Sequence, residues 1–291
     1  MAMIWAVVTK DEMANYKIPP IFQYYREVIG KENISLAVIN EDDDLSFVKD
    51  NDIVLLRSAN KAVISSIRNR NIITTAEDYS VYEAANDKAS LSIFLSQNGI
   101  LVPRQFHLSK IDSGITYFVK PRYGGESFGI TKDSICHTPR EVYQQVRLLE
   151  QEYDKEVVIE EFVDGVDCTV ACYYDPETDS VKTYAIQVEC DEVGGIQTHK
   201  GKFEYNEYCS ALDDETNERI CEISKDVFHL LKIKHHARID FRKADDGKLY
   251  LIDVNLLPGL GPSAHFAKCM LLTENKSYAD AIWAIIDSAT E

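Results

Sequence analysis

The chain has 291 residues, of which 45% are hydrophobic and 27% are charged. This length suits two or three compact units with a sizeable core, and the composition argues against global disorder. The formal net charge of −17 argues against a nucleic-acid-binding surface, which needs clustered Lys and Arg. Any bound phosphate must therefore be held by a local group of Lys, Arg and backbone N–H donors.

The cysteines and the apolar segments predict a cytoplasmic protein. The seven cysteines are odd in number and contain no Cys-x-x-Cys motif, so we expect reduced thiols. Met3–Val8 is a short apolar run that ends at a charged Thr-Lys-Asp stretch, unlike a signal peptide. No apolar run approaches about 18 residues, so we predict no contact with a membrane.

The first 79 residues or so have the pattern of a small α/β unit. Short β-branched runs predict buried strands at Ile4–Val8, Ile34–Ile39 and Ile53–Leu56. Helical spacing separates them at Pro20–Ile29 and Lys61–Asn69. Alternation of strands and helices indicates a parallel sheet. No Gly-x-Gly-x-x-Gly follows the first strand, so a dinucleotide-binding fingerprint is absent.

The middle of the chain alternates helices with extended segments. We expect one helix over Tyr79–Asn98, with Gly99 as the signal for its C-terminal end. Thr138–Gln151 is strongly amphipathic and begins with Thr-Pro, which is typical of a helix start. Strands are expected at Thr116–Lys120 and Val157–Phe162.

The last part of the chain predicts an antiparallel sheet with helices. Two of its strands should pair across a Pro-Glu-Thr-Asp turn, and Gly194–Tyr208 has the low periodicity of a mobile loop. The predicted elements here are strands at Cys168–Tyr174 and Val181–Glu189 and helices at Asp214–Leu231, Ala264–Leu272 and Tyr278–Ser288.

A hairpin late in the chain carries the residues most suggestive of chemistry. Ala237–Arg242 and Lys248–Val254 read as strands joined by Ala-Asp-Asp-Gly, a strong turn signal. Asp240 lies in the first strand, and Asp253 and Asn255 end the second. Three oxygen-bearing side chains on paired strands suit a hard cation such as Mg²⁺. Solvent-facing strand residues would give the same pattern, and the hairpin alone does not separate the two interpretations.

A glycine-rich stretch, Tyr123–Gly129, follows a strand that ends in Lys120. Such a turn can fold backbone N–H groups over phosphates, with the lysine as a nearby cation. A plain β-turn is the simpler interpretation of the stretch alone. Farther along, Glu160 to Val163 and then Asp167 combine backbone groups, an aromatic ring and a carboxylate, which adenine and ribose require. A strand with polar edges remains equally consistent with those residues.

The order of these parts is more informative than any one of them. In sequence they are Lys88, Val-Lys-Pro at 119–121, the glycine stretch, Ile159–Asp167, Ala-Arg-Ile-Asp at 237–240, Ile-Asp-Val-Asn at 252–255 and Pro-Gly at 258–259. In this order the chain resembles ATP-grasp enzymes, and among them most closely D-alanine–D-alanine ligases. The resemblance covers about residues 86 to 291.

The resemblance implies a nucleotide site. The residues expected at ATP are Lys88 and Lys120 at the phosphates, Gly125 and Ser127 in the covering loop, Glu160, Glu161, Phe162 and Val163 at the adenine, and Asp167 at the ribose. That family commonly has Glu where this chain has Asp167, and likewise at Asp253.

The resemblance also implies the residues of the reaction. Asp240, Asp253 and Asn255 would hold Mg²⁺, or Mn²⁺ in its place. The remaining residues are Arg238 at the transferred phosphoryl group, Lys200 or Lys202 at the γ-phosphate, and Gly259 and Ser263 at the carboxylate of an amino-acid substrate. The N-terminal His-Gly-Gly stretch of the family is missing, which leaves Glu12 as the candidate for the first substrate's ammonium. We expect His235 and His236 to be structural.

We therefore predict an α/β protein with the ATP-grasp fold. Its expected parts are a parallel-sheet domain at 1–80, a lid subdomain at 81–163 and a C-terminal antiparallel-sheet subdomain at 164–291. The expected function is an ATP-dependent carboxylate–amine ligase acting through an acyl phosphate, with D-alanine as the leading substrate and a homodimer as its assembly. The alternatives are a ligase of another amino acid or peptide, or a non-catalytic nucleotide-binding module.

Overall fold

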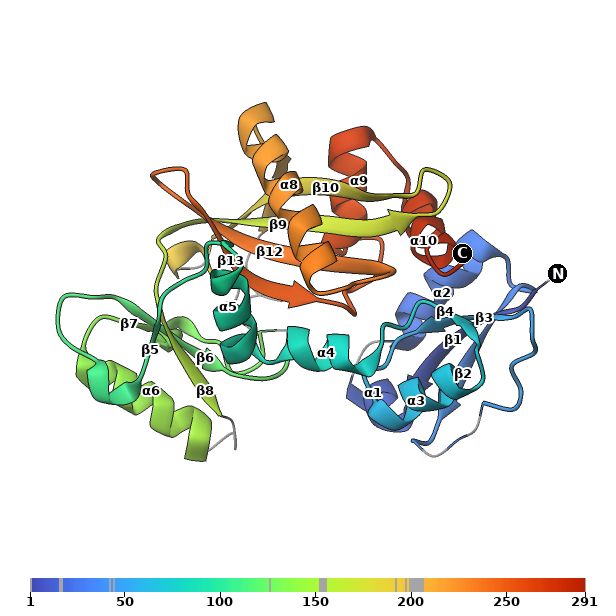
Figure 1. The fold of residues 1–291 in the computed structure, drawn as a ribbon, viewed down its shortest axis with the longest axis horizontal. Helices are drawn as coiled ribbons and strands as arrows, with labels where there is room; N and C mark the ends of the chain where they lie inside the picture. Colours follow the sequence, from blue (N-terminus) through green and yellow to red (C-terminus); the bar gives the residue numbers. More distant parts are fainter. Residues whose placement is uncertain are drawn as a thin grey trace.

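The computed structural model describes residues 2–15, 18–41, 43, 45–125, 127–151, 156–191, 193–196, 198 and 207–290. Within these residues the strands form three sheets, and helix α4 runs from the first sheet towards the other two (Figure 1). This arrangement confirms the predicted α/β class with one parallel and further antiparallel sheets. None of the described helices has both the length and the hydropathy needed to cross a membrane.

Sheet A is the parallel sheet predicted for the start of the chain. Its strand order is β2-β1-β3-β4, and all of its described pairs are parallel. The two-residue strand β4 was too short to show a sequence pattern. The elements are β1 (Ile4–Thr9), α1 (Lys10–Asn15), α2 (Ile18–Ile29), β2 (Ile34–Ile39), β3 (Ile53–Leu56), α3 (Lys61–Asn69) and β4 (Ile73–Thr74).

The predicted single helix Tyr79–Asn98 is wrong in one respect: it is two helices. Helix α4 (Tyr79–Asn86) ends before Asp87, and α5 (Lys88–Gln97) begins after it. The Asp87 carboxylate accepts a hydrogen bond from the Ser90 backbone N–H at 3.2 Å, so it caps α5. Asp is a preferred N-cap residue because it satisfies an N–H donor that the helix leaves unpaired. The chain therefore starts a new helix here.

Sheet B is a small antiparallel sheet with its own core. Its order is β5-β8-β6-β7, and the amphipathic helix α6 covers one face through Val142, Val146 and Leu149. The elements are β5 (Gln105–Phe106), β6 (Tyr117–Pro121), β7 (Ile135–Cys136), α6 (Pro139–Gln151), β8 (Val157–Glu161) and the short 3₁₀ turns η1 (Leu108–Lys110) and η2 (Lys132–Ser134).

Sheet C is the antiparallel sheet that holds the predicted hairpin. Its order is β11-β10-β9-β12-β13. The strand β11 was not expected, because its first residues fall in the segment 194–208 that we predicted as a loop. The elements are β9 (Gly165–Asp175), β10 (Ser180–Cys190), η3 (Val193–Gly195), β11 (Glu207–Ala211), α8 (Asp214–Leu230), β12 (His236–Ala244), β13 (Leu249–Asn255), α9 (His265–Glu274) and α10 (Tyr278–Asp287).

The two faces of sheet C are covered by different helices. Val170 of β9 belongs to the hydrophobic cluster that contains Phe228 of α8. Its neighbour Ala171 belongs to the cluster that contains Phe266 of α9. Successive residues of a strand point to opposite faces, so α8 and α9 lie on opposite sides of the sheet. Burying each aromatic ring contributes roughly 1.5–3 kcal/mol.

A buried carboxylate ties the segment after sheet A to the start of β12. Glu77 is only 1% exposed, and its side chain accepts hydrogen bonds from the backbone N–H groups of Lys234 and His235 at 3.0 and 2.8 Å. Burial raises the pKa of Glu77 to about 7, although these hydrogen bonds act in the opposite direction. The Glu77 carboxyl group therefore titrates near neutral pH.

Replacement of Glu77 should change how stability depends on pH. Between pH 4.5 and about 7 the folded chain binds more protons at Glu77 than the unfolded chain, so the free energy of unfolding falls as pH rises. Relative to Glu77→Gln, we expect the natural chain to lose about 3 kcal/mol across this interval. Urea denaturation at several pH values measures the difference, and identical pH slopes for both proteins would contradict it.

Candidate active site

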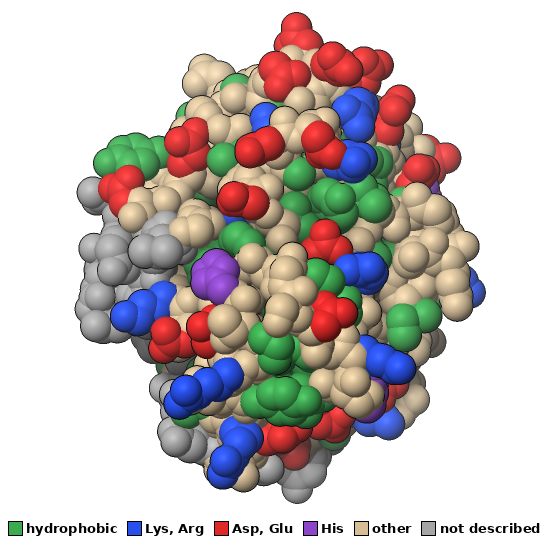
Figure 2. Space-filling view, turned by 90° about the vertical axis from the view of Figure 1, so that its left-hand side faces the viewer, with side chains coloured by type: hydrophobic (Ala, Val, Ile, Leu, Met, Phe, Trp, Pro, Cys, Tyr) green, Lys and Arg blue, Asp and Glu red, His purple; other side chains and the backbone are tan. Residues whose placement is uncertain are grey.

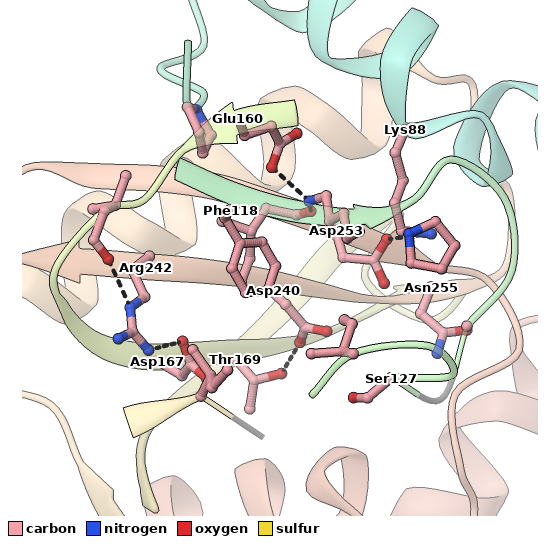
Figure 3. Close-up of a pocket in the computed structure, with 18 of the residues that line it drawn as sticks. Lys88, Phe118, Ser127, Glu160, Asp167, Thr169, Asp240, Arg242, Asp253 and Asn255 are labelled. Carbon is pink, nitrogen blue, oxygen red and sulfur yellow. Dashed lines mark hydrogen bonds and ion pairs between the residues drawn. The ribbon is translucent and has the colours of Figure 1, made fainter. Parts of the chain in front are cut away.

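A pocket between sheets B and C gathers most of the predicted site residues (Figure 3). Strands of both sheets, the start of α5 and the glycine stretch line it. The predicted residues along its wall are Lys88, Lys120, Gly125, Ser127, Glu160, Glu161, Phe162, Val163, Asp167, Arg238, Asp240, Asp253 and Asn255. Gly259 and Ser263 do not line this pocket. Lys200 and Lys202 lie outside the described residues.

The alternation of β12 places its charged residues on the pocket side. Ala237 and Ile239 are fully buried in the core on the α8 side of sheet C. Arg238, Asp240 and Arg242 alternate with them, and all three line the pocket. A period of two residues therefore brings three charges from one strand to one surface.

A β-bulge in β13 turns its carboxylate towards the same pocket. Asp240 pairs with Asp253, but the next residue, Phe241, pairs with Leu251, so Ile252 is the extra residue. Without the bulge, Asp253 would lie on the same face as Leu251, which is 3% exposed in the core. Bulges re-aim side chains in this way and are frequent beside active sites. The hairpin's acidic residues are therefore not simply solvent-facing.

Asp240 is held as an ionised carboxylate. Arg238 Nη2 lies 2.7 Å from Asp240 Oδ2, and the Thr169 hydroxyl donates to Oδ1 at 2.5 Å. Burial by itself would raise the pKa of Asp240, but Arg238 and the Thr169 hydroxyl outweigh it and hold the pKa below its ordinary value. A carboxylate that stays ionised is available to a cation.

The donor set around Asp240 fits a hard divalent ion. Asp253 lies opposite Asp240, and Asn255 lies opposite Arg238 on the neighbouring strand. Directly opposed side chains in an antiparallel pair have Cβ atoms about 4.5–5.5 Å apart, close enough to share one ion. Carboxylate and amide oxygens are the ligands that Mg²⁺ and Mn²⁺ prefer. Lys88 Nζ lies 3.8 Å from the Asp253 carboxylate.

Lys120 is a buried cation on the opposite wall. Its side chain is 6% exposed and forms an ion pair of 2.8 Å with Glu160, whose side chain is 5% exposed. Lys120 Nζ also donates to the Ile252 carbonyl at 3.3 Å, which links β6 of sheet B to the bulge in sheet C. The pair is held in place from both sheets.

The described residues of the glycine stretch include three with positive φ. Gly124 and Gly129 have φ values of 95° and 75°, and Ser127 has φ of 58°. A serine in this left-handed region is uncommon and marks a tightly turned loop. The Asn86 side chain accepts from the Gly124 backbone N–H at 2.9 Å, and the Lys88 ammonium donates to the Gly124 carbonyl. The loop is thus fastened to the break between α4 and α5.

Arg122 strengthens this attachment. Its guanidinium donates two hydrogen bonds of 2.7 Å to the Asp87 carboxylate and a third, of 3.0 Å, to Glu156. Paired donors of this kind give the strongest side-chain hydrogen bonds. They hold the pKa of Asp87 well below its usual range, against the effect of burial. The helix break that sequence periodicity missed is therefore also the anchor of the glycine loop.

The end of the pocket near Phe162 has the character of a slot for a flat ring. The rings of Phe118 and Phe162 lie 6.2 Å apart, tilted by 35°. Arg242 lies over the Phe162 ring at 5.6 Å and pairs with Asp167 at 2.7 Å. It also donates to the Val163 carbonyl at 3.1 Å. Apolar faces, a backbone carbonyl and the Asp167 carboxylate thus lie together at this end of the pocket. Their roles at adenine and ribose stay a prediction.

Sequence reasoning missed Thr169, Arg242 and Phe118 as pocket residues. Each lies two residues from a predicted one on the same strand: Thr169 follows Asp167, Arg242 follows Asp240, and Phe118 precedes Lys120. Extending the two-residue alternation would have found them.

Three residues considered for other roles lie away from the pocket wall. Glu12 accepts hydrogen bonds from the Thr9 backbone and hydroxyl at 3.1 and 2.8 Å, at the end of β1. His235 and His236 are 6% and 1% exposed and do not line the pocket. Burial lowers the pKa of His236 well below its ordinary value, so this ring is neutral.

The pocket brings cations together with carboxylates in a protein whose net charge is strongly negative. Figure 2 shows many Asp and Glu side chains along the upper part of one face, with Lys and Arg side chains both among them and lower down. Lys88, Lys120, Arg238 and Arg242 all line the pocket. They form the local group of cations that a phosphate ligand would need in a chain of net charge −17.

The D-ala D-ala ligase C-terminus family matches residues 95–287. The chain belongs to the D-alanine–D-alanine ligase family. It is 27% identical over 223 residues to a D-alanine–D-alanine ligase of Acetivibrio thermocellus, covering 72% of this chain and 56% of that protein. It is 25% identical over 215 residues to the uncharacterized protein y4sG of Sinorhizobium fredii, covering 70% and 62%. The chain thus spans about three fifths of the length of these relatives.

Solved structures of the family share the fold over the whole chain. The D-alanine–D-alanine ligase from Bacillus anthracis complexed with ATP gives a TM-score of 0.75 at 20% identity, covering 99% of this chain and 97% of that one. The VanG D-Ala:D-Ser ligase from Enterococcus faecalis gives 0.77 at 17% identity, covering 100% of both. The ATP-grasp fold expected from the sequence is therefore confirmed, including sheet A, which the family match does not reach.

Removal of Arg122 should loosen the glycine loop. Arg122→Met takes away three hydrogen bonds to carboxylates, so we expect the free energy of unfolding to fall by about 2 kcal/mol. We also expect faster cleavage within 123–129 by a non-specific protease. Arg147→Met is the control, since Arg147 makes one exposed contact of 3.4 Å to Gln151. Equal effects of the two substitutions on stability and cleavage would contradict the anchoring role.

Proposed function

We propose that this protein is an ATP-dependent carboxylate–amine ligase that forms an amide bond through an acyl phosphate. One observation carries the proposal: Lys88, Lys120, Arg238 and two in-register carboxylates face one pocket that ends in an aromatic slot. Family membership supports the same activity. The chemistry needs charge neutralisation and positioning more than a protein nucleophile, and the pocket offers cations and oxygen ligands.

ATP would lie between sheets B and C. The adenine would enter the slot beside Phe162, with Glu160, Glu161 and Val163 along its edge and Asp167 at the ribose. Lys88 and Lys120 would contact the phosphates, and the loop that contains Gly125 and Ser127 would cover them. Because each of these charged groups already has an ion partner, nucleotide binding would exchange one partner for another rather than expose a charge.

The donor's carboxylate oxygen would attack the γ-phosphate, giving ADP and an acyl phosphate. The acceptor amine would then attack the acyl carbon and phosphate would leave. Arg238 would stabilise the negative charge on the phosphoryl group and on the tetrahedral oxyanion. Mg²⁺ or Mn²⁺, held by Asp240, Asp253 and Asn255, would neutralise phosphate charge when bound. Lys200 or Lys202 remains the proposed loop lysine at the γ-phosphate.

The substrates are proposed from the family. D-alanine is our leading choice for both donor and acceptor, with Gly259 and Ser263 near a substrate carboxylate. Another amino acid or a short peptide is the second choice, because the N-terminal stretch Ala6–Glu12 lacks the Gly-Gly of the family. We further propose domains at 1–80, 81–163 and 164–291, and a homodimer.

A substrate screen distinguishes the candidate functions. The purified protein with ATP and Mg²⁺ should release ADP in the presence of an amino acid, most strongly with D-alanine. Maximal release with another D- or L-amino acid or a dipeptide would identify the second choice. Absence of ADP release with every carboxylate and amine, from a protein that still binds ATP, would favour a non-catalytic nucleotide-binding module and contradict the proposal.

Loss of a single carboxylate should stop turnover without unfolding the chain. Asp240→Asn removes the charge of a proposed metal ligand, so we expect kcat to fall by at least about 100-fold. Asp246→Asn is the matched control, because Asp246 lies exposed in the β12–β13 turn and pairs only with Lys248 among the described residues. Circular dichroism checks that both variants are folded. Full activity of Asp240→Asn would show that the metal site is wrong.

A further inference from the structure

A second group of metal-binding side chains lies beside the pocket, on β11 and α9. Glu207 and Cys209 are two residues apart on β11, so they point to the same side of the strand. His265 is the first residue of α9 and also lines the pocket. One ligand atom from each of the three residues can be chosen so that all lie within 4.8 Å of one another.

Two of the three distances between these ligand atoms are close to those of a tetrahedral site. His265 Nε2 lies 2.8 Å from Glu207 Oε1, and Cys209 Sγ lies 3.4 Å from the same oxygen. Around a tetrahedral zinc ion, with bonds of about 2.0–2.3 Å, these separations would be about 3.3 and 3.5 Å. Shifts of a few tenths of an ångström would therefore bring each of these two pairs to the distance that the ion requires. The third pair, His265 and Cys209, lies within 4.8 Å, and a turn of either side chain would close the rest of that gap.

A positive charge already occupies this group. Lys268, one turn along α9 from His265, places Nζ 2.8 Å from Glu207 Oε1 and 3.6 Å from Cys209 Sγ. The Lys268 ammonium thus contacts both the Glu207 carboxylate and the Cys209 sulfur, as a bound metal ion would. Its side chain is 28% exposed and can move into solvent. Lys268 is thus a competitor of a metal ion for these ligands.

We propose that Glu207, Cys209 and His265 bind Zn²⁺ or a similar borderline-soft divalent ion, with water as the fourth ligand. Thiolate and imidazole ligands select zinc-like ions, whereas the all-oxygen set of Asp240, Asp253 and Asn255 suits Mg²⁺. The chain would then hold two kinds of metal ion at neighbouring places. This site does not depend on the proposed ligase activity, since it is defined by binding alone.

Cobalt provides the direct test because its thiolate complexes absorb light. The full-length protein is titrated with Co²⁺ in a large excess of Mg²⁺, which saturates oxygen-only sites. We expect a thiolate-to-cobalt charge-transfer band that saturates at one ion per chain and is removed by added Zn²⁺. The band should be lost in Cys209→Ser and kept in Cys221→Ser, which changes another partly buried thiol, on α8.

Two further variants keep the test independent of misfolding. Glu207→Gln should weaken Co²⁺ binding by at least about tenfold. Lys268→Met should strengthen it by about tenfold, because the competing ammonium is gone, and a gain in affinity requires a folded site. The proposal is overturned if the natural protein shows no thiolate band, if Cys209→Ser keeps it, or if Lys268→Met binds Co²⁺ no more tightly.

Discussion

The pairing of β12 with β13 is the constraint on which the whole pocket depends. Ile252 is the extra residue in that pairing, and it brings Asp253 opposite Asp240 and Asn255 opposite Arg238. Without it, the last residues of β13 would exchange faces, and a carboxylate would point into the core on the α8 side. Burying an unpaired carboxylate is strongly unfavourable, so the fold and the site require the same register.

Most charged side chains of the pocket are paired with a side chain of opposite charge. Asp240 pairs with Arg238, Glu160 with Lys120 and Asp167 with Arg242, at distances of 2.7–2.8 Å. Pairs with this little exposure add little net stability, but removing one partner is costly. They keep the polar groups of two sheets in place before any ligand arrives. The described pocket lining also holds four cations, the kind of side chain that a phosphate ligand would need in an acidic protein.

The sequence predicted the sheets better than it predicted where a helix is interrupted or a strand pairing shifts. The strands of sheet A and the hairpin of sheet C were found because a period of two and β-branched runs reflect burial directly. The helix break at Asp87 was missed because capping depends on one residue, and the pattern on either side stays helical. The bulge at Ile252 cannot be read from alternation, since it interrupts that alternation. The long helix α8 and the order of the charged motifs were predictable. That Arg242 pairs with Asp167, and Thr169 with Asp240, became visible only in the three-dimensional structure.

We propose that this pocket activates a carboxylate by transferring a phosphoryl group to it. Isotope transfer tests that step directly. The protein is given ATP, Mg²⁺ and D-alanine labelled with ¹⁸O in its carboxylate, and the released phosphate is examined by ³¹P NMR. If an acyl phosphate forms and its bond to the acyl carbon breaks, each phosphate carries one ¹⁸O atom from the donor. Amide formation with unlabelled phosphate would contradict the account.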